Sequence, residues 1–323
     1  MKRLRIGIIG LGHLGIAHLK NAKEIDNVEI AGINDINIDK ARKLSEEYGV
    51  PYYQKPDDLI KNVDCISIVT PTIEHYKLAK HSLLCRKHIF IEKPITSTTS
   101  EADELIEIAN NYNLKIQVGH IERFNPAFKA ISKLKPAPMF IEAHRLASFV
   151  PRGTDVSVIL DIMIHDIDII LKLVPSEIEN IEASGVKVIT DNIDIANARI
   201  KFKNKAVANI TASRISQRKM RKMRLFQKSS YISINFLEKS AEYFKLIKNN
   251  EYQKDNKETI IDYPGKNKKV LYYKLQPPDE DALKSELNSF IQSILNDTTP
   301  EVSGEEGRNA LDIALKILDK INE

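Results

Sequence analysis

Hydrophobic residues in the first 120 positions form short β-branched runs separated by longer amphipathic stretches. The runs have the length of strands, and the stretches have the period of helices. We predict strands at 4–9, 28–33, 65–69, 88–91 and 115–118 and helices at 14–25, 39–48, 73–84 and 100–111. Strands that alternate with helices in this way are typical of a parallel sheet covered by helices on both faces.

The pattern changes after about residue 122. One helical stretch, 156–173, precedes strand-like runs at 178–189, 193–202, 206–213, 220–226, 230–236 and 270–275. Successive strands without intervening helices favour an antiparallel sheet. Two helices, 281–295 and 304–321, are expected to end the chain, the second behind a capping box of Ser303 and Glu306. The polar stretch 248–258 is predicted to be a mobile hairpin loop.

A chain of 323 residues exceeds what one hydrophobic core usually serves, so two domains are expected. We place the boundary where the pattern changes. The first domain, 1–122, carries the parallel sheet, and the second, 123–323, is an α/β domain with an open, mostly antiparallel sheet that we expect to bind substrate and to form oligomers.

Composition narrows the class of protein. Hydrophobic residues make up 42% and charged residues 28%, and no apolar run reaches the roughly 18 residues that span a bilayer, so we predict no membrane insertion. Residues 2–16 superficially resemble a secretory signal, but four glycines and His13 interrupt them, so a cytoplasmic location is expected. A net charge of +4 is too small to indicate a nucleic-acid surface. The two cysteines, Cys65 and Cys85, lack metal-type spacing and are predicted to be buried thiols.

The clearest motif is Gly10-Leu11-Gly12-His13-Leu14-Gly15, which follows the first strand and opens a helix. Gly10 permits the tight turn, Gly12 lets the backbone approach a pyrophosphate, and Gly15 lets the helix pack on the strand. The free N–H groups and dipole of the helix start bind phosphates. Asp35 ends the second strand, where a carboxylate accepts hydrogen bonds from ribose hydroxyls and repels a 2′-phosphate. Together these residues predict a Rossmann domain that binds NAD rather than NADP.

Further motifs follow later strands of the first domain. Thr70-Pro71, with His75, comes after the third predicted strand, and Glu92-Lys93-Pro94 comes after the fourth. Ligands of open parallel sheets bind at the carboxyl ends of the strands, so Lys93 is expected beside the cofactor. The alternative interpretation of Lys93 is a solvated loop lysine.

These motifs, followed by Asp161-x-x-x-His165, resemble the Gfo/Idh/MocA oxidoreductase family over essentially the whole chain. The resemblance implies an NAD-dependent dehydrogenase acting on the CH–OH group of a sugar, with its active site between the two domains. It implies that Lys93 contacts substrate near the nicotinamide and that Asp161 and His165 complete the catalytic set. A homodimer or homotetramer is also implied, because family members commonly pair their open sheets. The expected cofactor site comprises Gly10, Gly12, His13, Leu14, Asp35, Thr70, Pro71, His75, Glu92 and Lys93.

The spacing of Asp161 and His165 supports catalysis independently. Four residues apart on a helix, the two side chains project from the same face. The imidazole titrates near neutral pH, so His165 is our candidate general base, and Asp161 would orient it. Two other interpretations remain. Asp166 and Asp168 could make this a solvated helix face, and Asp161, His165 and Asp168 could bind a metal, although hydride transfer to NAD needs none and we expect no metal.

A finer resemblance concerns the substrate. The runs 119–126, 151–156 and 210–214 are similar to those of bacterial UDP-N-acetylglucosamine 3-dehydrogenases. Such enzymes oxidise the 3-hydroxyl to a ketone, which an aminotransferase uses in diamino-sugar lipid A synthesis. Arg123, Arg152 and Arg214 are candidate contacts for the diphosphate. The basic run 218–224 is expected to be a solvated face or subunit contact. An inositol or other polyol dehydrogenase and a non-catalytic NAD-binding regulator remain alternatives.

Overall fold

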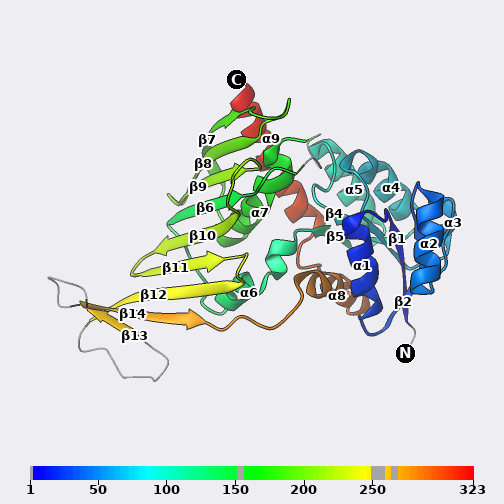
Figure 1. Ribbon diagram of the computed structural model, residues 1–323, viewed down its shortest axis with the longest axis horizontal. Helices are drawn as coiled ribbons and strands as arrows, with labels where there is room; N and C mark the ends of the chain where they lie inside the picture. The colour runs from blue at the N-terminus through cyan, green and yellow to red at the C-terminus, as the bar shows by residue number, and fades with distance from the viewer. Residues whose placement is uncertain (1–2, 151–155, 249–258, 263–267) are drawn as a thin grey trace. The chain divides into compact units, whose positions relative to one another are not determined.

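The computed structural model describes residues 3–150, 156–248, 259–262 and 268–323 (Figure 1). The chain forms two compact units. The first contains Met1–Phe124 and Glu280–Asp312, and the second contains Asn125–Asp279 and Ile313–Glu323. The first change of unit lies close to the predicted boundary at 122. However, the prediction of a continuous second domain over 123–323 is wrong, because Glu280–Asp312 returns to the first unit.

The first unit is built on a five-stranded parallel sheet in the order β2-β1-β3-β4-β5. The fold is therefore the predicted Rossmann type, and the carboxyl ends of all five strands meet at one edge. Its strands are β1 (Leu4–Ile9), β2 (Val28–Asn34), β3 (Cys65–Ile68), β4 (His88–Glu92) and β5 (Ile116–Gly119). Its helices up to Phe124 are α1 (His13–Lys23), α2 (Ile38–Tyr48), α3 (Pro56–Lys61), α4 (Thr72–Leu84), α5 (Thr99–Asn111) and the short 3-10 helix η1 (Ile121–Phe124).

Helix α8 (Ala282–Leu295) joins the first unit because its apolar side covers this sheet. Its residues Leu283, Leu287, Phe290 and Ile291 pack with Leu4, Ile6, Cys65 and Phe90 in one core cluster. The rings of Phe90 and Phe290 meet edge to face at 5.9 Å. The last helix, α9 (Gly304–Asn322), begins with the predicted capping box: Glu306 N–H donates to Ser303 Oγ, and Ser303 N–H donates to the Glu306 carboxylate. No helix among the described residues is both long and apolar enough to cross a membrane.

The second unit is built on a nine-stranded sheet in the order β13-β14-β12-β11-β10-β6-β9-β8-β7. Among the described strands of this sheet only the β6 and β9 pair is parallel, so the predicted mostly antiparallel sheet is confirmed. The strands are β6 (Phe140–Leu146), β7 (Ile178–Val186), β8 (Ile195–Phe202), β9 (Val207–Ser213), β10 (Met220–Gln227), β11 (Ser230–Asn235), β12 (Ser240–Lys248), β13 (Thr259–Asp262) and β14 (Lys268–Leu275). The expected mobile loop after residue 248 lies outside the described residues.

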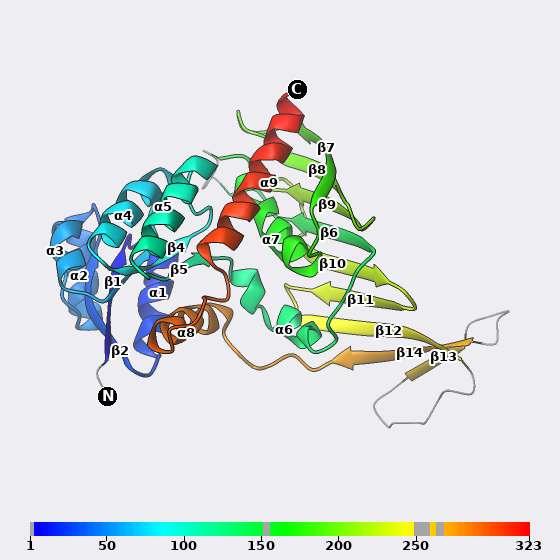
Figure 2. The same ribbon diagram turned by 180° about the vertical axis from the view of Figure 1, so that it is seen from behind.

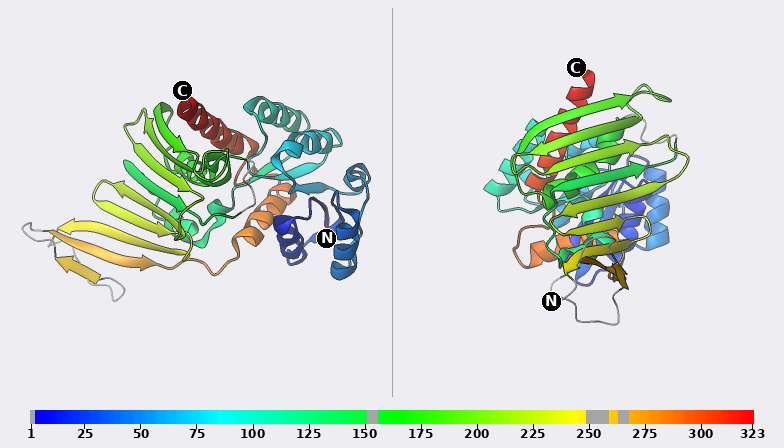
Figure 3. Two further views of the ribbon diagram at one scale, coloured as in Figure 1. Left: turned by 45° about the horizontal axis from the view of Figure 1, so that its top comes forward. Right: turned by 90° about the vertical axis from the view of Figure 1, so that its left-hand side faces the viewer.

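Two helices, α6 (Pro126–Ser132) and α7 (Ile164–Leu173), lie against one face of this sheet (Figure 2). The turn before α7, named η2 (Ile159–Met163), is π-helical, which the predicted helix 156–173 did not anticipate. In the right-hand view of Figure 3 no described helix of the second unit covers the opposite face. We call this the open face. It carries a row of aromatic rings whose neighbouring centroids are 4.9–5.9 Å apart: Phe140, Phe226, Tyr231, Phe244 and Tyr272.

Candidate active site

The glycine-rich turn connects β1 to α1 at the carboxyl edge of the parallel sheet. Gly10 has a φ of 93°, and a Cβ there would lie 2.4 Å from the Val69 carbonyl oxygen. A Cβ on Gly15 would lie 1.9 Å from the carbonyl oxygen of Gly10. A Cβ on Gly12, in contrast, would meet nothing within 4 Å. Two glycines therefore permit tight packing, and the third leaves the backbone beside open space, as pyrophosphate binding requires.

The first turn of α1 also suits an anion. Gly12 is its N-cap, and the turn, which begins with His13 and Leu14, contains no acidic residue. Both basic residues of the last turn, Lys20 and Lys23, lie at the opposite end. The positive end of the helix dipole and the first N–H groups can therefore serve a phosphate. Gly12, His13 and Leu14, which were predicted to contact the cofactor, all lie at the start of this helix.

Asp35 connects the end of β2 to the glycine-rich turn. One carboxylate oxygen accepts a 2.6 Å hydrogen bond from Leu11 N–H, and the other accepts a 2.9 Å bond from Asn37 N–H. Each oxygen keeps a further lone pair that ribose hydroxyls can use. Ile36 is fully exposed and Ile73 is 79% exposed at the same edge of the sheet, where they offer apolar surface to a flat ring. Sequence reasoning missed both isoleucines, because the hydrophobic pattern does not tell an exposed isoleucine from a buried one.

The Glu92-Lys93-Pro94 motif begins at the last residue of β4, and its Lys93–Pro94 peptide is cis. Lys93 is half-buried, whereas Glu92 is buried. One Glu92 carboxylate oxygen lies 3.0 Å from His18 Nε2, and the other accepts from Lys93 N–H at 3.3 Å. Gly119 on β5 makes room for this carboxyl group, since a Cβ there would approach it to 2.8 Å. The structure thus gives Glu92 contacts within the protein, and its expected contact with the cofactor stays a prediction.

His75 connects the turns after β3 and β4. Its ring is buried, with Nδ1 2.8 Å from the Pro94 carbonyl oxygen and Nε2 2.9 Å from the Thr70 carbonyl oxygen. Burial lowers the pKa of His75, and the two carbonyl groups oppose that shift. Both His75 nitrogens therefore face backbone carbonyl groups. The cofactor contacts expected of His75, Thr70 and Pro71 stay predictions.

The second unit carries the other predicted catalytic residues. Asp161 lies in the π-helical turn η2, and His165 lies in the first turn of α7. Both side chains are half-buried. Single π-helical turns within α-helices are frequent at functional sites, and the hydrophobic period of the sequence gives no signal for them.

The residues that flank His165 are not a solvated face. Asp166 and Asp168 are 2% and 0% exposed. Asp166 forms a two-point ion pair with buried Arg145, at 3.0 Å from Nε and 2.7 Å from Nη2. The alternative of a solvated helix is therefore wrong for these two positions. Among the described residues no group of three or more His, Cys, Asp or Glu side chains is arranged to hold a metal ion.

Where the structure describes them, the arginines that were predicted to contact the diphosphate contact other residues of this chain. Arg123 is buried and lies 3.4 Å from a carboxylate oxygen of Glu306. Arg214 is buried, and its Nη2 donates to the Val156 carbonyl at 2.6 Å. Arg152 lies outside the described residues. In β10, Met223 and Leu225 are buried, whereas Lys222 and Arg224 are exposed, as a strand requires.

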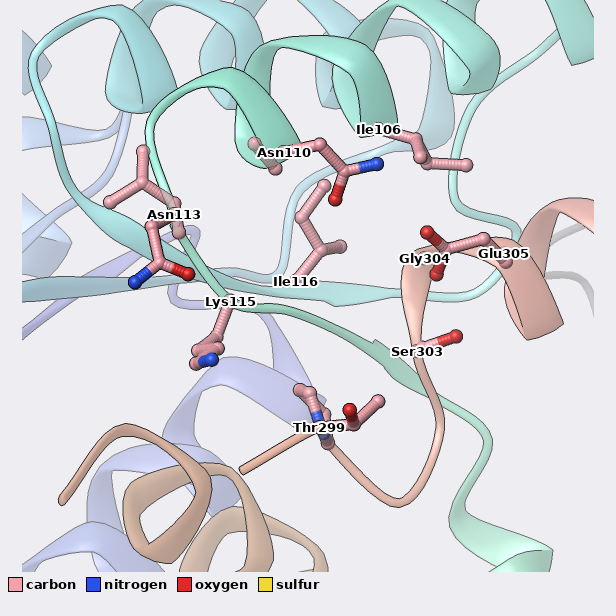
Figure 4. A pocket seen from close by; sticks show the side chains of 12 residues that line it. Ile106, Asn110, Asn113, Lys115, Ile116, Thr299, Ser303, Gly304 and Glu305 are labelled. Atoms are coloured by element: carbon pink, nitrogen blue, oxygen red, sulfur yellow. The ribbon is translucent and has the colours of Figure 1, made fainter. Parts of the chain in front are cut away.

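A pocket of about 200 Å³ in the first unit is lined by none of the predicted site residues (Figure 4). Asn110, Asn113 and Lys115 line one side, and Ser303, Gly304 and Glu305 line the other. It adjoins the amino end of β5 and the carboxyl end of α5. Cofactors bind at the opposite edge of such sheets, so we assign this pocket no part in the site.

Comparison with known proteins agrees with this geometry. Residues 4–120 match the family described as "Oxidoreductase family, NAD-binding Rossmann fold", and residues 140–229 match the "GFO/IDH/MocA C-terminal domain". The chain therefore belongs to the Gfo/Idh/MocA oxidoreductase family, its first unit is an NAD-binding domain, and NAD is its cofactor, as predicted.

Several similar proteins are named for the reaction that they catalyse. The UDP-N-acetylglucosamine 3-dehydrogenase of Acidithiobacillus ferrooxidans is 34% identical over 98% of this chain and 97% of the relative. Its solved structure matches with a TM-score of 0.89, covering 99% of this chain and 98% of that chain. The myo-inositol 2-dehydrogenase of Thermotoga maritima is 27% identical over 95% of this chain and 93% of the relative. A scyllo-inositol dehydrogenase from Lactobacillus casei with bound NAD(H) and scyllo-inositol is 20% identical and shares the fold, with a TM-score of 0.78 over 99% of this chain and 97% of that chain.

Proposed function

We propose that this protein oxidises the 3-hydroxyl of a UDP-N-acetylhexosamine, UDP-N-acetylglucosamine in the first instance, to a 3-keto sugar with NAD. The similarity to the Acidithiobacillus enzyme carries the proposal, because it extends over nearly the whole of both chains at 34% identity. The similarity to the Thermotoga inositol enzyme is also nearly full-length but only 27%. The resemblance of 119–126, 151–156 and 210–214 to such sugar dehydrogenases supports the same conclusion.

We assign three side chains to the chemistry. Bound NAD supplies the acceptor for the hydride that leaves the alcohol carbon. His165 removes the hydroxyl proton, and the Lys93 ammonium donates a hydrogen bond to the oxygen as its negative charge develops. Asp161 orients the imidazole. The balanced result is a ketone, NADH and one proton.

The test is an absorbance assay for NADH with UDP-N-acetylglucosamine, UDP-N-acetylgalactosamine, myo-inositol and scyllo-inositol. Turnover of a UDP-sugar is expected. Turnover of an inositol alone would establish the rival polyol dehydrogenase, which the Thermotoga relative supports. No turnover with any of the four would favour a non-catalytic NAD-binding regulator.

Replacing His165 tests its role in proton transfer. His165→Ala should lower kcat by at least roughly a hundredfold, because general-base catalysis contributes that much, with the Kd for NAD unchanged. His81→Ala is a matched control, since the His81 side chain is 45% exposed on α4. Wild-type turnover in His165→Ala would refute the assignment.

For the nucleotide, we propose NAD in preference to NADP. Asp35 supports this choice, because its carboxylate would repel a 2′-phosphate at the ribose. Isothermal calorimetry of both cofactors tests it, and equal affinity would contradict it.

We also propose that the keto sugar is consumed by an aminotransferase in diamino-sugar lipid A synthesis. An added PLP-dependent aminotransferase with its amino donor should then increase the yield of NADH.

We propose that the protein forms a homodimer or homotetramer through the open face and that it is located in the cytoplasm. The aromatic row supports a second copy as the occupant: Phe226 is 38% exposed, and paired copies would cover the row symmetrically. Cys65 and Cys85 are free thiols, which fits a reducing compartment. Light scattering should give a multiple of 36.7 kDa, and Phe226→Lys should reduce it, whereas Leu237→Lys in the turn after β11 should not. A monomeric wild type would refute the oligomer.

A further inference from the structure

Two buried histidines lie on either side of the Glu92-Lys93-Pro94 motif. We propose that His18 and His75 are positioning residues that together hold the peptide of Lys93 at the carboxyl edge of the sheet. The proposal rests on the role of Lys93 proposed above, and it gives His75 a task other than cofactor contact.

His18 fixes the residue before the lysine. Its ring is fully buried and meets Phe90 edge to face at 5.1 Å. Nδ1 lies 2.9 Å from Ser67 Oγ on β3, and Nε2 lies 3.0 Å from the Glu92 carboxylate at the end of β4. The same carboxylate accepts from Lys93 N–H. A continuous set of contacts therefore runs from α1 through Glu92 to the lysine backbone.

His75 fixes the residue after the lysine. Its Nδ1 contacts the Pro94 carbonyl, and its Nε2 contacts the Thr70 carbonyl in the turn after β3. The ring is 1% exposed, so water does not compete for these contacts. A neutral imidazole has one N–H, and with that proton on Nδ1 the ring donates to the Pro94 carbonyl and holds the turn after β4 against α4.

Such fixation matters because the position of the Lys93 backbone determines the region that its ammonium group can reach. A reacting group misplaced by about 1 Å can lower a rate by roughly a hundredfold. Neither histidine needs to touch substrate to have this effect. The two contacts that adjoin Lys93 are His18 Nε2 with Glu92 and His75 Nδ1 with Pro94; the other contact of each ring anchors it.

Asparagine and glutamine substitutions separate these contacts. The amide nitrogen of asparagine reaches the place of Nδ1, and that of glutamine reaches the place of Nε2. His18→Gln and His75→Asn therefore keep the contact beside Lys93 and should retain kcat within about threefold. His18→Asn and His75→Gln lose it and should lower kcat by roughly 10- to 100-fold, with the Kd for NAD nearly unchanged. His88→Gln, at the opposite end of β4, is the control, since His88 contacts Lys115 N–H and not the motif.

A readout that needs no substrate completes the test. Lysines are reductively methylated with ¹³C-formaldehyde, and the Lys93 signal is identified by its loss in Lys93→Arg. The chemical shift of this signal and its change with pH should match the wild type in His18→Gln, His75→Asn and His88→Gln. Both should differ from the wild type in His18→Asn and His75→Gln. Equal behaviour of the Asn and Gln variants at both positions would overturn the proposal. If the wild type oxidises none of the sugars, the proposed function fails, and the Lys93 signal alone decides whether the histidines position the lysine.

Discussion

The ion pair between Arg145 and Asp166 offers a sharp test of how the second unit is stabilised. Arg145 lies on β6, Asp166 lies on α7, and two hydrogen bonds of 3.0 and 2.7 Å connect them. The side chains are only 4% and 3% exposed, and the guanidinium also lies 5.4 Å from the Phe236 ring. Removing either partner would leave the other charge buried and without its counter-charge.

The expected loss in the free energy of unfolding follows from this burial. Breaking a buried pair from one side costs about 3–5 kcal/mol, whereas replacing both partners by apolar residues of similar volume is often nearly neutral. For a unit of this size each kcal/mol lowers Tm by about 2–4 °C. Arg145→Met and Asp166→Leu should each therefore lower the Tm of the second unit by roughly 6–20 °C.

Differential scanning calorimetry of the two single variants and of the double variant measures the coupling. The double variant should be more stable than either single variant, with a coupling energy of about 2 kcal/mol or more. Single variants within about 0.5 kcal/mol of the wild type, or a double variant whose loss is the sum of the two, would refute the reasoning.

Three further predictions concern separate parts of the chain. Phe290→Ala should destabilise the first unit by about 3–5 kcal/mol in urea unfolding, because a fully buried ring leaves a cavity, whereas exposed Leu295→Ala should stay within about 0.5 kcal/mol. Burial of Asp194 disfavours its charge, but hydrogen bonds from three successive backbone N–H groups outweigh this and hold its pKa below the usual value. Asp194→Asn should therefore lose most stability above about pH 4, and its difference from the wild type should shrink as the pH falls. Asp35→Ser should weaken NAD binding by roughly tenfold or more in calorimetry and bring the affinities for NAD and NADP closer together.

Local signals account for the parts of the fold that the sequence predicted. Mostly apolar runs such as Leu4–Ile9 and Cys65–Ile68 give buried parallel strands. The glycine-rich turn directly follows β1, and Asp35 directly follows β2. β6 was not predicted, because Glu142, His144 and Arg145 interrupt its apolar pattern. Arg145 is buried there beside Asp166, which lies on another element and neutralises its charge.

Features that depend on distant contacts were not predictable from local pattern. The contacts of His18 with Ser67 and Glu92 join residues 49 and 74 positions apart. The amphipathic pattern of 281–295 predicted a helix but did not indicate which sheet it covers. Arg123 was interpreted as a substrate contact, since its contact with Glu306 joins residues 183 positions apart and leaves no local signal in the sequence.

The return of Glu280–Asp312 to the first unit has a consequence for synthesis of the protein. While the ribosome is making the second unit, the apolar residues Leu4, Ile6 and Phe90 still lack the helix that will bury them. At usual elongation rates this interval lasts on the order of 10 s or more. A nascent chain is therefore exposed to aggregation through this surface throughout that interval, and a chaperone that binds apolar segments would be most useful to it then.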